Sequence, residues 1–255
     1  WEITADSLIY SANRIPEISD DIINIDNAMK WGYGWELGPF ECWDAMGVQS
    51  TVNRMKKENK NVPSWVDDML SSGRETFYEL KNGKRTYYDV LSSSVKTIED
   101  DPKVINLNLK KSGNNLIKKD WSASLIDLGD QVLNVEFHSA LQPTINPIDT
   151  SMGEMMGDAM DLLESDQYKA LVIGHQGANF CAGANLANMI QVIDAKRFDK
   201  IDDSIKKFQD LMQRIRFSKA PVVVAPHHLA LGGGFEISAP AAHRVALGEL
   251  YMGAV

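Results

Sequence analysis

The chain has 255 residues, with 26 basic and 35 acidic side chains and a formal net charge of −9. With 44% hydrophobic and 24% charged residues it can bury a sizeable core, which excludes a disordered chain. The acidic balance argues against a nucleic-acid partner, because phosphate binding requires a basic surface. No apolar run reaches the roughly 20 residues of a membrane-spanning helix, so no transmembrane segment is expected.

Cysteine usage indicates the cellular compartment. Two cysteines, Cys42 and Cys181, are too few for a disulfide framework or for a zinc site built on thiolates. This content suits a reducing cytosol, and we therefore expect a cytoplasmic protein. The first residue is Trp1 and not Met, so we expect the chain to be a piece of a longer protein.

The first 70 residues are expected to be helical. Ser19, followed by two aspartates, predicts the start of a helix that ends at Gly32. Pro39 has the place of a first helical residue, with Gly47 as the stop of that helix. A further short helix is predicted to begin at Pro63.

The middle of the chain changes from helical to strand-like patterns. Residues 76–80 and 85–90 are aromatic and β-branched runs, and the Asn82-Gly83 dipeptide between them predicts a β-hairpin. We interpret the polar residues 91–118 as a linker between two domains. Within this linker, residues 104–109 are also compatible with an edge strand.

From residue 121 onward, strands and helices are expected to alternate. Residues 122–128 and 131–138 predict two strands joined by a turn. Asn146 is placed to cap a helix that has Pro147 at its first position.

Two short apolar runs, residues 170–174 and 221–225, predict buried strands. A helical pattern over residues 201–215 separates them. Strand, helix and strand at these lengths predict right-handed crossovers and a sheet covered by helices.

The most informative segment is residues 229–236, which read Leu-Ala-Leu-Gly-Gly-Gly-Phe-Glu after a buried strand. Three glycines at a strand-to-helix junction leave backbone N–H groups uncovered, and the helix N-terminus adds positive partial charge. Glu236 is placed to face the same cavity as these N–H groups. A tight turn with a solvent-exposed glutamate is the competing interpretation of the same spacing.

A second loop, residues 179–186, also follows a buried strand and precedes a helix. Its small residues at 182–184 would let a ligand approach backbone donors closely. Taken alone it is an ordinary strand-to-helix loop. Two such loops after parallel strands, however, place their N–H groups at the same sheet edge, where open α/β sheets bind ligands.

The sequence Phe-Cys-Ala-Gly-Ala-Asn-Leu at residues 180–186 resembles the first oxyanion-loop motif of the crotonase (enoyl-CoA hydratase/isomerase) superfamily, and residues 231–236 resemble its second motif. The resemblance implies that the N–H groups of Ala184 and Gly233 hold the oxygen of an acyl-CoA thioester. It also implies that Glu236 is one of two carboxylates that position water.

The same resemblance places the CoA-binding segment at Thr144, Ile145 and Ala182. It implies an acyl-CoA substrate and a possible homo-oligomer. The family's second glutamate is expected just beyond Val255, with helices that complete the fold, so we expect a C-terminally truncated domain that is inactive alone. The sequence departs from the common family pattern at Asn185, His227, His228 and Ala242.

The N-terminal segment carries a second resemblance. Residues 25–34, followed by Leu-Gly-Pro-Phe-Glu at residues 37–41, resemble the helical C-terminal domain of 3-hydroxyacyl-CoA dehydrogenases. Together the resemblances imply an α+β protein: a helical dehydrogenase-tail domain at residues 1–90 that ends in the hairpin, the linker, and an incomplete crotonase-like α/β domain of ββα repeats at residues 119–255.

This order is that of bifunctional β-oxidation enzymes. The resemblance implies hydration of trans-2-enoyl-CoA to 3-hydroxyacyl-CoA, coupled in the full protein to NAD-dependent dehydrogenation. The sequence has no Gly-x-Gly-x-x-Gly fingerprint, so NAD is expected only in a domain that precedes this chain. The five histidines show no metal-ligand spacing, and no metal site is expected.

Two alternatives remain open. An enoyl-CoA isomerase uses the same oxyanion loops with a single acid/base, and the residue after Val255 would discriminate it from a hydratase. A non-catalytic acyl-CoA-binding domain would retain the cleft without turnover.

Overall fold

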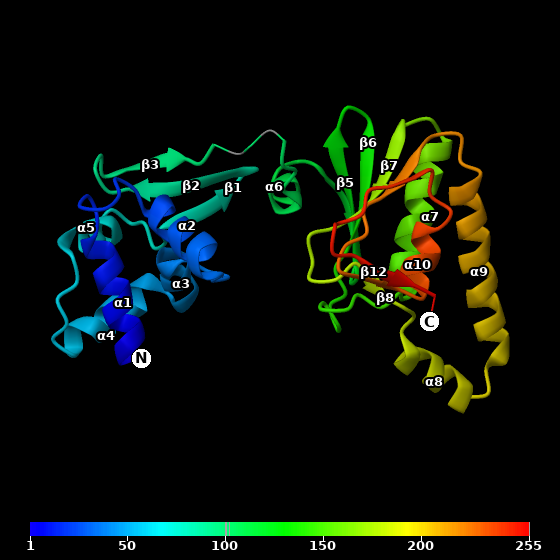
Figure 1. Cartoon of the computed structure of the whole chain (residues 1–255), viewed down its shortest axis with the longest axis horizontal. Helices are drawn as coiled ribbons and strands as arrows, with labels where there is room; N and C mark the ends of the chain where they lie inside the picture. The colour runs from blue at the N-terminus through cyan, green and yellow to red at the C-terminus, as the bar shows by residue number, and fades with distance from the viewer. Residues whose placement is uncertain (100, 102, 255) are drawn as a thin grey trace. The chain divides into compact units, whose positions relative to one another are not determined.

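The computed structural model describes residues 1–99, 101 and 103–254. It divides into two compact units, Trp1–Ile105 and Asn106–Val255, each with its own hydrophobic core (Figure 1). Asp100 and Pro102, in the expected linker, and Val255, at the expected truncation, lie outside the described residues. None of the helices in the described part of the chain is long and apolar enough to cross a membrane.

The N-terminal unit combines helices with a three-stranded antiparallel sheet of order β1-β2-β3. Its core is aromatic, with the Phe77 ring 5.2 Å from that of Phe40 and 5.4 Å from that of Trp43. The predicted helical character of this region is confirmed. Its elements are α1 (Glu2–Asn13), α2 (Ile22–Tyr33), α3 (Pro39–Met46), α4 (Val48–Lys57), α5 (Ser64–Ser71), β1 (Tyr78–Lys81), β2 (Lys84–Asp89) and β3 (Ser94–Thr97).

The predicted bounds of α3 are right and those of α2 are wrong. α3 begins at Pro39 and is followed by Gly47. The cap of α2 is Asp21, whose carboxylate accepts the Asn24 N–H at 2.8 Å. Ser19 lies too far upstream of α2 to reach the N–H groups of its first turn. The helix continues through Gly32 to Gly34, which takes the left-handed conformation (φ 68°) that ends many helices.

A buried carboxylate, Asp26, organises the start of α3. It is 1% exposed and accepts the backbone N–H groups of Phe40 at 2.8 Å and Glu41 at 3.2 Å, and the Tyr78 hydroxyl at 2.8 Å. A Cβ on Gly38 would lie 2.3 Å from the Asp26 Cβ, so only glycine lets Asp26 approach. The Leu-Gly-Pro-Phe-Glu motif therefore builds a helix cap from a distant side chain.

A second carboxylate, Asp44, accepts the N–H groups of Phe77 at 2.7 Å and Tyr78 at 2.9 Å, and so ties α3 to the start of β1. Burial raises the pKa values of Asp26 and Asp44 from 3.8 to about 6, against the opposing effect of these hydrogen bonds.

These raised pKa values predict an unusual pH dependence. Between about pH 4 and pH 6 the folded unit binds more protons than the unfolded chain, so its free energy of unfolding falls as the pH rises through this window. Each carboxyl contributes at most about 3 kcal/mol to the fall. Guanidinium unfolding followed by tryptophan fluorescence at several pH values measures it.

We compare Asp44→Asn with Asp68→Asn to isolate the contribution of the Asp44 carboxyl. Asp68 serves as the control because it is exposed on α5. We expect Asp44→Asn to reduce the fall in the free energy of unfolding between pH 4 and pH 6, and Asp68→Asn to leave that fall unchanged. A wild-type free energy of unfolding that rises from pH 4 to pH 6, with the same slope in both variants, would contradict the assignment.

The predicted hairpin is confirmed. β1 and β2 pair in antiparallel register, and Asn82 (φ 51°) and Gly83 (φ 73°) form the turn between them.

The segment 91–118 is not simply a linker. It contains β3, which pairs with β2, the helix α6 (Leu107–Ser112) and the strand β4 (Leu116–Lys119). The suggested edge strand at residues 104–109 is wrong, since Asn106 caps α6 there through the N–H groups of Asn108 and Leu109. β3 and β4 are exposed along their whole length, so no alternation of apolar and polar residues marks them.

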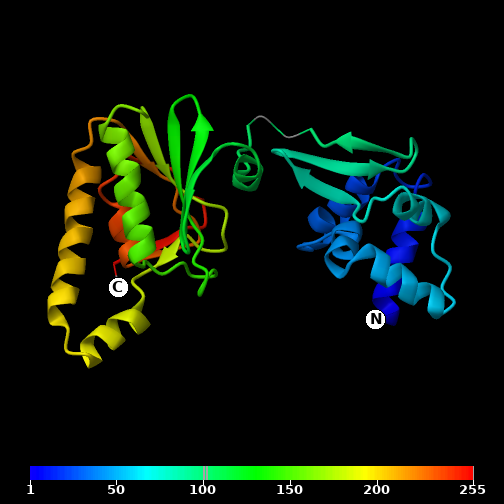
Figure 2. The ribbon, with the colours of Figure 1, turned by 180° about the vertical axis from the view of Figure 1, so that it is seen from behind.

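The C-terminal unit holds a six-stranded sheet of order β11-β9-β7-β6-β5-β4 and a small parallel sheet of order β12-β10-β8. The expected parallel, helix-covered strands are confirmed for β6, β7 and β9. α7 lies between the large sheet and α9, as Figure 2 shows from behind. The remaining elements are β5 (Ala123–Gly129), β6 (Val132–Phe137), α7 (Thr150–Glu164), β7 (Ala170–Ile173), β8 (Cys181–Ala182), α8 (Leu186–Asp194), α9 (Phe198–Arg216), β9 (Val222–Val224), β10 (Leu229–Leu231), α10 (Gly233–Ser238), β11 (His243–Arg244) and β12 (Tyr251–Gly253).

The predicted cap of α7 is wrong. The helix begins at Thr150, and the Asp149 carboxylate caps it by accepting the Met152 N–H at 2.9 Å. Asn146 is instead 1% exposed and accepts the Ser139 N–H at 2.8 Å through its side-chain oxygen. The sequence pattern could not separate these two candidates, because both are good capping residues and only the chain path decides which one reaches the helix.

Candidate active site

The two glycine-containing turns lie at the same edge of the small sheet. β8 and β10 are parallel neighbours, with Ala230 opposite Cys181, so their carboxyl ends point the same way. The turns that follow approach closely, since a Cβ on Gly232 would lie 3.4 Å from the Gly183 Cα. Both glycines have positive φ, 80° at Gly183 and 52° at Gly232, which other residues rarely adopt. The predicted convergence of two strand-to-helix turns is therefore present, but the turns follow β8 and β10 of the small sheet and not the predicted strands at residues 170–174 and 221–225.

Backbone pairing leaves the Ala184 amide available. Ile148 bridges to Ala184: the Ile148 N–H donates to the Gly183 carbonyl at 2.8 Å, and the Asn185 N–H donates to the Ile148 carbonyl at 3.0 Å. In such a parallel bridge the central residue's own N–H takes no part. Among the described residues, neither the Ala184 N–H nor the Gly233 N–H has a backbone acceptor.

Close packing explains why the second turn consists of glycines. A Cβ on Gly233 would lie 2.3 Å from Cδ1 of Ile148, the end of a flexible side chain. A Cβ on Gly234 would lie 2.3 Å from the carbonyl oxygen of Cys181, which is backbone and cannot move aside without displacing β8. The second turn is thus pressed against the first.

A cavity of about 870 Å³ is lined by three of the six predicted site residues. Ala184, Gly233 and Glu236 all line it, together with residues of α7, α8 and α9. The Glu236 side chain is exposed, in the first turn of α10, and among the described residues its carboxylate has no hydrogen-bond or ion-pair partner. Other lining residues include Ile148, Gly153, Glu154, Gly157, Met189 and Phe208.

The three residues assigned to CoA binding lie side by side, outside the lining of this cavity. The Ala182 N–H donates to the Ile145 carbonyl at 2.8 Å. The Asn179 side-chain amide donates to the Thr144 carbonyl at 2.8 Å. None of the three is among the cavity-lining residues, and their role in CoA binding stays a prediction.

Cys181, also in the first loop, is fully buried, and burial raises the pKa of its thiol to about 12. It packs as an apolar residue and is not a reactive thiolate. Within the described residues, no group of three or more His, Cys, Asp or Glu side chains is arranged to hold a metal ion.

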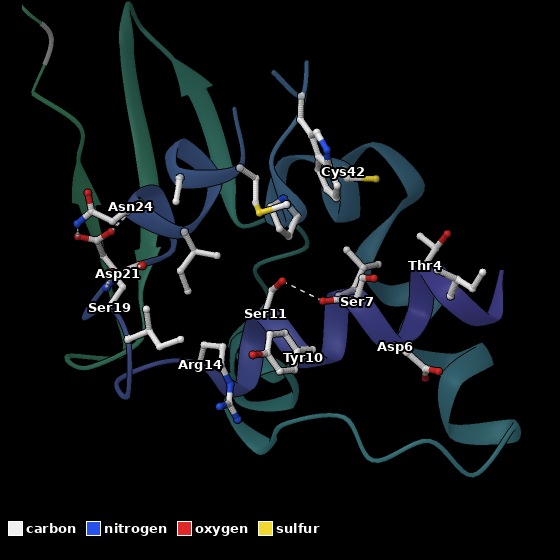
Figure 3. A pocket seen from close by; sticks show the side chains of 18 of the residues that line it. Thr4, Asp6, Ser7, Tyr10, Ser11, Arg14, Ser19, Asp21, Asn24 and Cys42 are labelled. Carbon is white, nitrogen blue, oxygen red and sulfur yellow. Dashed lines mark hydrogen bonds between the residues drawn. The ribbon is translucent and has the colours of Figure 1, made fainter. Parts of the chain in front are cut away.

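A larger cavity, about 1420 Å³, lies in the N-terminal unit beside α1, α2 and α3 (Figure 3). Tyr10, Arg14, Asp21, Asn24 and Cys42 are among its lining residues. It contains none of the predicted site residues.

The sequence does not reveal that the Ile148 backbone orients Ala184. It also does not reveal which residues of α7 and α9 line the cavity. Ile148 lies in a loop with no motif of its own. The lining residues are scattered over separate helices, so no local signal in the sequence marks them.

Comparison with known proteins supports part of this interpretation. Residues 141–253 match the family model described as enoyl-CoA hydratase/isomerase. Over 255 residues the chain is 44% identical to the "Probable 3-hydroxyacyl-CoA dehydrogenase" of Bacillus subtilis (strain 168), covering 100% of this chain and 31% of that protein.

It is 26% identical to the "Putative fatty acid oxidation complex trifunctional enzyme" of Rickettsia felis, covering 100% of this chain and 31% of that protein. The chain thus spans less than a third of the length of these two relatives. A crystal structure of an enoyl-CoA hydratase from Thermoplasma volcanium aligns with a TM-score of 0.45 and 25% identity over 53% of this chain and 52% of that chain. Residues 141–253 are therefore similar to the enoyl-CoA hydratase/isomerase family, and the whole chain is similar to part of two longer proteins, one named as a dehydrogenase and one as a fatty acid oxidation enzyme.

Proposed function

We propose that the C-terminal unit hydrates trans-2-enoyl-CoA to 3-hydroxyacyl-CoA. The observation that carries this proposal is that Ala184, Gly233 and Glu236 line one cavity, where the two backbone amides have no backbone acceptor and the carboxylate has no partner among the described residues. The match of residues 141–253 to the enoyl-CoA hydratase/isomerase family model supports the substrate class.

The geometry suits the charge that the reaction develops. When the water oxygen bonds to C3 of the enoyl group, the electron pair of the double bond moves to the thioester oxygen as an enolate. The amides of Ala184 and Gly233 stabilise that oxygen, and the loss of one such donor typically lowers a rate by about 10²–10³. The proton that the water loses passes to the Glu236 carboxylate and from there to C2 of the enolate, so that the elements of one water molecule are added.

Glu236 has the acid–base role in this scheme. Its carboxylate accepts a hydrogen bond from the attacking water and exchanges a proton with it, a contribution of about 10²–10⁴ in rate. Because Glu236 lines the cavity and its carboxylate has no hydrogen-bond or ion-pair partner among the described residues, it is free to serve the substrate.

We further propose that the chain belongs to a longer bifunctional enzyme that oxidises the hydration product. The printed names of the relatives and the Leu-Gly-Pro-Phe-Glu motif support this. The residues present do not fit NAD, because the sequence has no Gly-x-Gly-x-x-Gly fingerprint. No step in this chain is assigned to NAD.

The test is hydration of crotonyl-CoA by the full protein and two glutamine variants. We expect Glu236→Gln to lower kcat by about 10²–10⁴. Glu154→Gln is the matched control, because Glu154 lines the same cavity from α7. We expect its kcat to stay within a fewfold of the wild type. Equal rates for Glu236→Gln and the wild type would rule out the assigned role.

An enoyl-CoA isomerase is the second candidate, favoured by the single carboxylate that the two turns themselves supply. The same proteins assayed with a 3-enoyl-CoA distinguish it, since an isomerase shifts the double bond without consuming water. Tight binding of enoyl-CoA with neither reaction would identify a non-catalytic acyl-CoA-binding domain.

A further inference from the structure

A buried histidine with no role in the proposed chemistry follows β7. His175 is 9% exposed, and its ring stacks on Phe180 with centroids 5.6 Å apart and planes 14° apart. Phe137 and His227 pack around it, with ring centroids at 6.0 Å and 4.8 Å. The imidazole therefore lies inside the loop that leads from β7 to the first of the two turns.

Both ring nitrogens of His175 bind the backbone of its own loop. Nδ1 accepts the Gly177 N–H at 3.1 Å, so it carries no proton. Nε2 lies 2.8 Å from the Phe180 carbonyl oxygen, which can only accept, so Nε2 carries the proton and donates. One neutral tautomer satisfies both contacts, whereas a protonated ring would place a second donor against the Gly177 N–H.

A second histidine clamps the same loop from outside. The Phe180 N–H donates to the His227 carbonyl at 3.2 Å, and His227 Nε2 lies 2.9 Å from the Gly177 carbonyl oxygen. Both backbone groups of Phe180 are thus held by histidines. Burial lowers the pKa of His175 to about 4, with His227 and His138 acting in the same direction, so the ring is neutral at pH 7.

The clamped peptide directly precedes the first turn of the proposed oxyanion site, and the residue after it contacts the second turn. The next residue, Cys181, pairs with β10, and its carbonyl oxygen is the atom against which Gly234 is pressed. Ala184 follows three residues later. A shift of Phe180 would therefore change the position of the Ala184 amide relative to the turn of Gly233.

We propose that His175 is a positioning residue: its neutral imidazole bridges Gly177 and Phe180 and thereby sets the spacing of the Ala184 and Gly233 amides. The oxyanion role of these amides rests on the proposed hydration. The bridging of the loop by the imidazole is independent of the proposed hydration.

The experiment compares His175→Phe with His138→Phe in the full protein. Phenylalanine keeps the aromatic packing of His175 and removes both hydrogen bonds. His138 is a matched control in the same unit, because its Nε2 makes one hydrogen bond, at 2.7 Å, to the Ser124 hydroxyl. Amide hydrogen exchange at residues 177–184 and crotonyl-CoA hydration are measured for each.

We expect His175→Phe to raise exchange of the Gly177 amide by about tenfold or more, since its acceptor is lost. We expect kcat to fall by about 10²-fold with KM within about threefold, because amide placement affects the transition state more than binding. We expect His138→Phe to change neither the exchange of the Gly177 amide nor kcat by a comparable factor. In the wild type, NMR of the His175 ring nitrogens should show the Nε2–H tautomer at neutral pH. This measurement requires no variant.

The outcomes separate the two proposals. If the wild type fails to hydrate enoyl-CoA, the proposed function fails, and exchange and tautomer still decide whether His175 fixes the loop. If exchange in His175→Phe matches that in His138→Phe, or if the ring carries its proton on Nδ1, the positioning role is overturned. A large fall in kcat that His138→Phe reproduces would also overturn it.

Discussion

Replacing Gly234 by alanine is expected to lower the rate of enoyl-CoA hydration by at least about 10²-fold. The added methyl would lie 2.3 Å from the Cys181 carbonyl oxygen, so either β8 or the turn before α10 must move. Either movement separates the Ala184 and Gly233 amides, and a displacement of about 1 Å at a reacting centre can cost about 10² in rate. Steady-state hydration of crotonyl-CoA measures the effect.

The same substitution should also destabilise the C-terminal unit by about 1–3 kcal/mol, as overpacking of a well-packed site does. Gly248→Ala is the control, because a Cβ there meets no atom within 4 Å and its φ is not positive. We expect Gly248→Ala to retain the wild-type rate. A Gly234→Ala variant with wild-type kcat would show that the two turns are not held against each other as the structure has them.

Replacing Asp26 by alanine is expected to destabilise the N-terminal unit by roughly 3–4 kcal/mol. The substitution removes the acceptor of three hydrogen bonds, from the N–H groups of Phe40 and Glu41 and from the Tyr78 hydroxyl. A buried donor that loses its partner costs about 1–3 kcal/mol, and the hydrogen bonds from the Glu41 N–H and the Tyr78 hydroxyl are only partly buried. Guanidinium unfolding monitored by tryptophan fluorescence reports on this unit, whose core contains Trp43.

Asp21→Ala provides the comparison, because Asp21 is also a helix-capping carboxylate but lies at the surface. Loss of an exposed cap of this kind costs about 1 kcal/mol. If both variants lose the same free energy of unfolding, the burial of Asp26 and of its three hydrogen bonds does not add the stability that we assign to it.

The features that the sequence predicts well are those that depend on near neighbours in the chain. The hairpin turn at residues 82–83 and the start of α3 at Pro39 follow from the φ angles that these residues favour. The two turns of the candidate site are local in the same sense, since glycine is required where φ is positive or where another backbone approaches. Their convergence could be anticipated because parallel strands end at one sheet edge.

Other features were decided only by tertiary structure, because their partners are far apart in the chain. Asp26 caps a helix that begins thirteen residues later, and β3 gains its place by pairing with β2 although all four of its residues are exposed. His175 looks in the sequence like any core histidine. Its two backbone partners become evident only when the loop folds around the ring, since a hydrogen bond depends on distance and direction and leaves no pattern in composition or spacing.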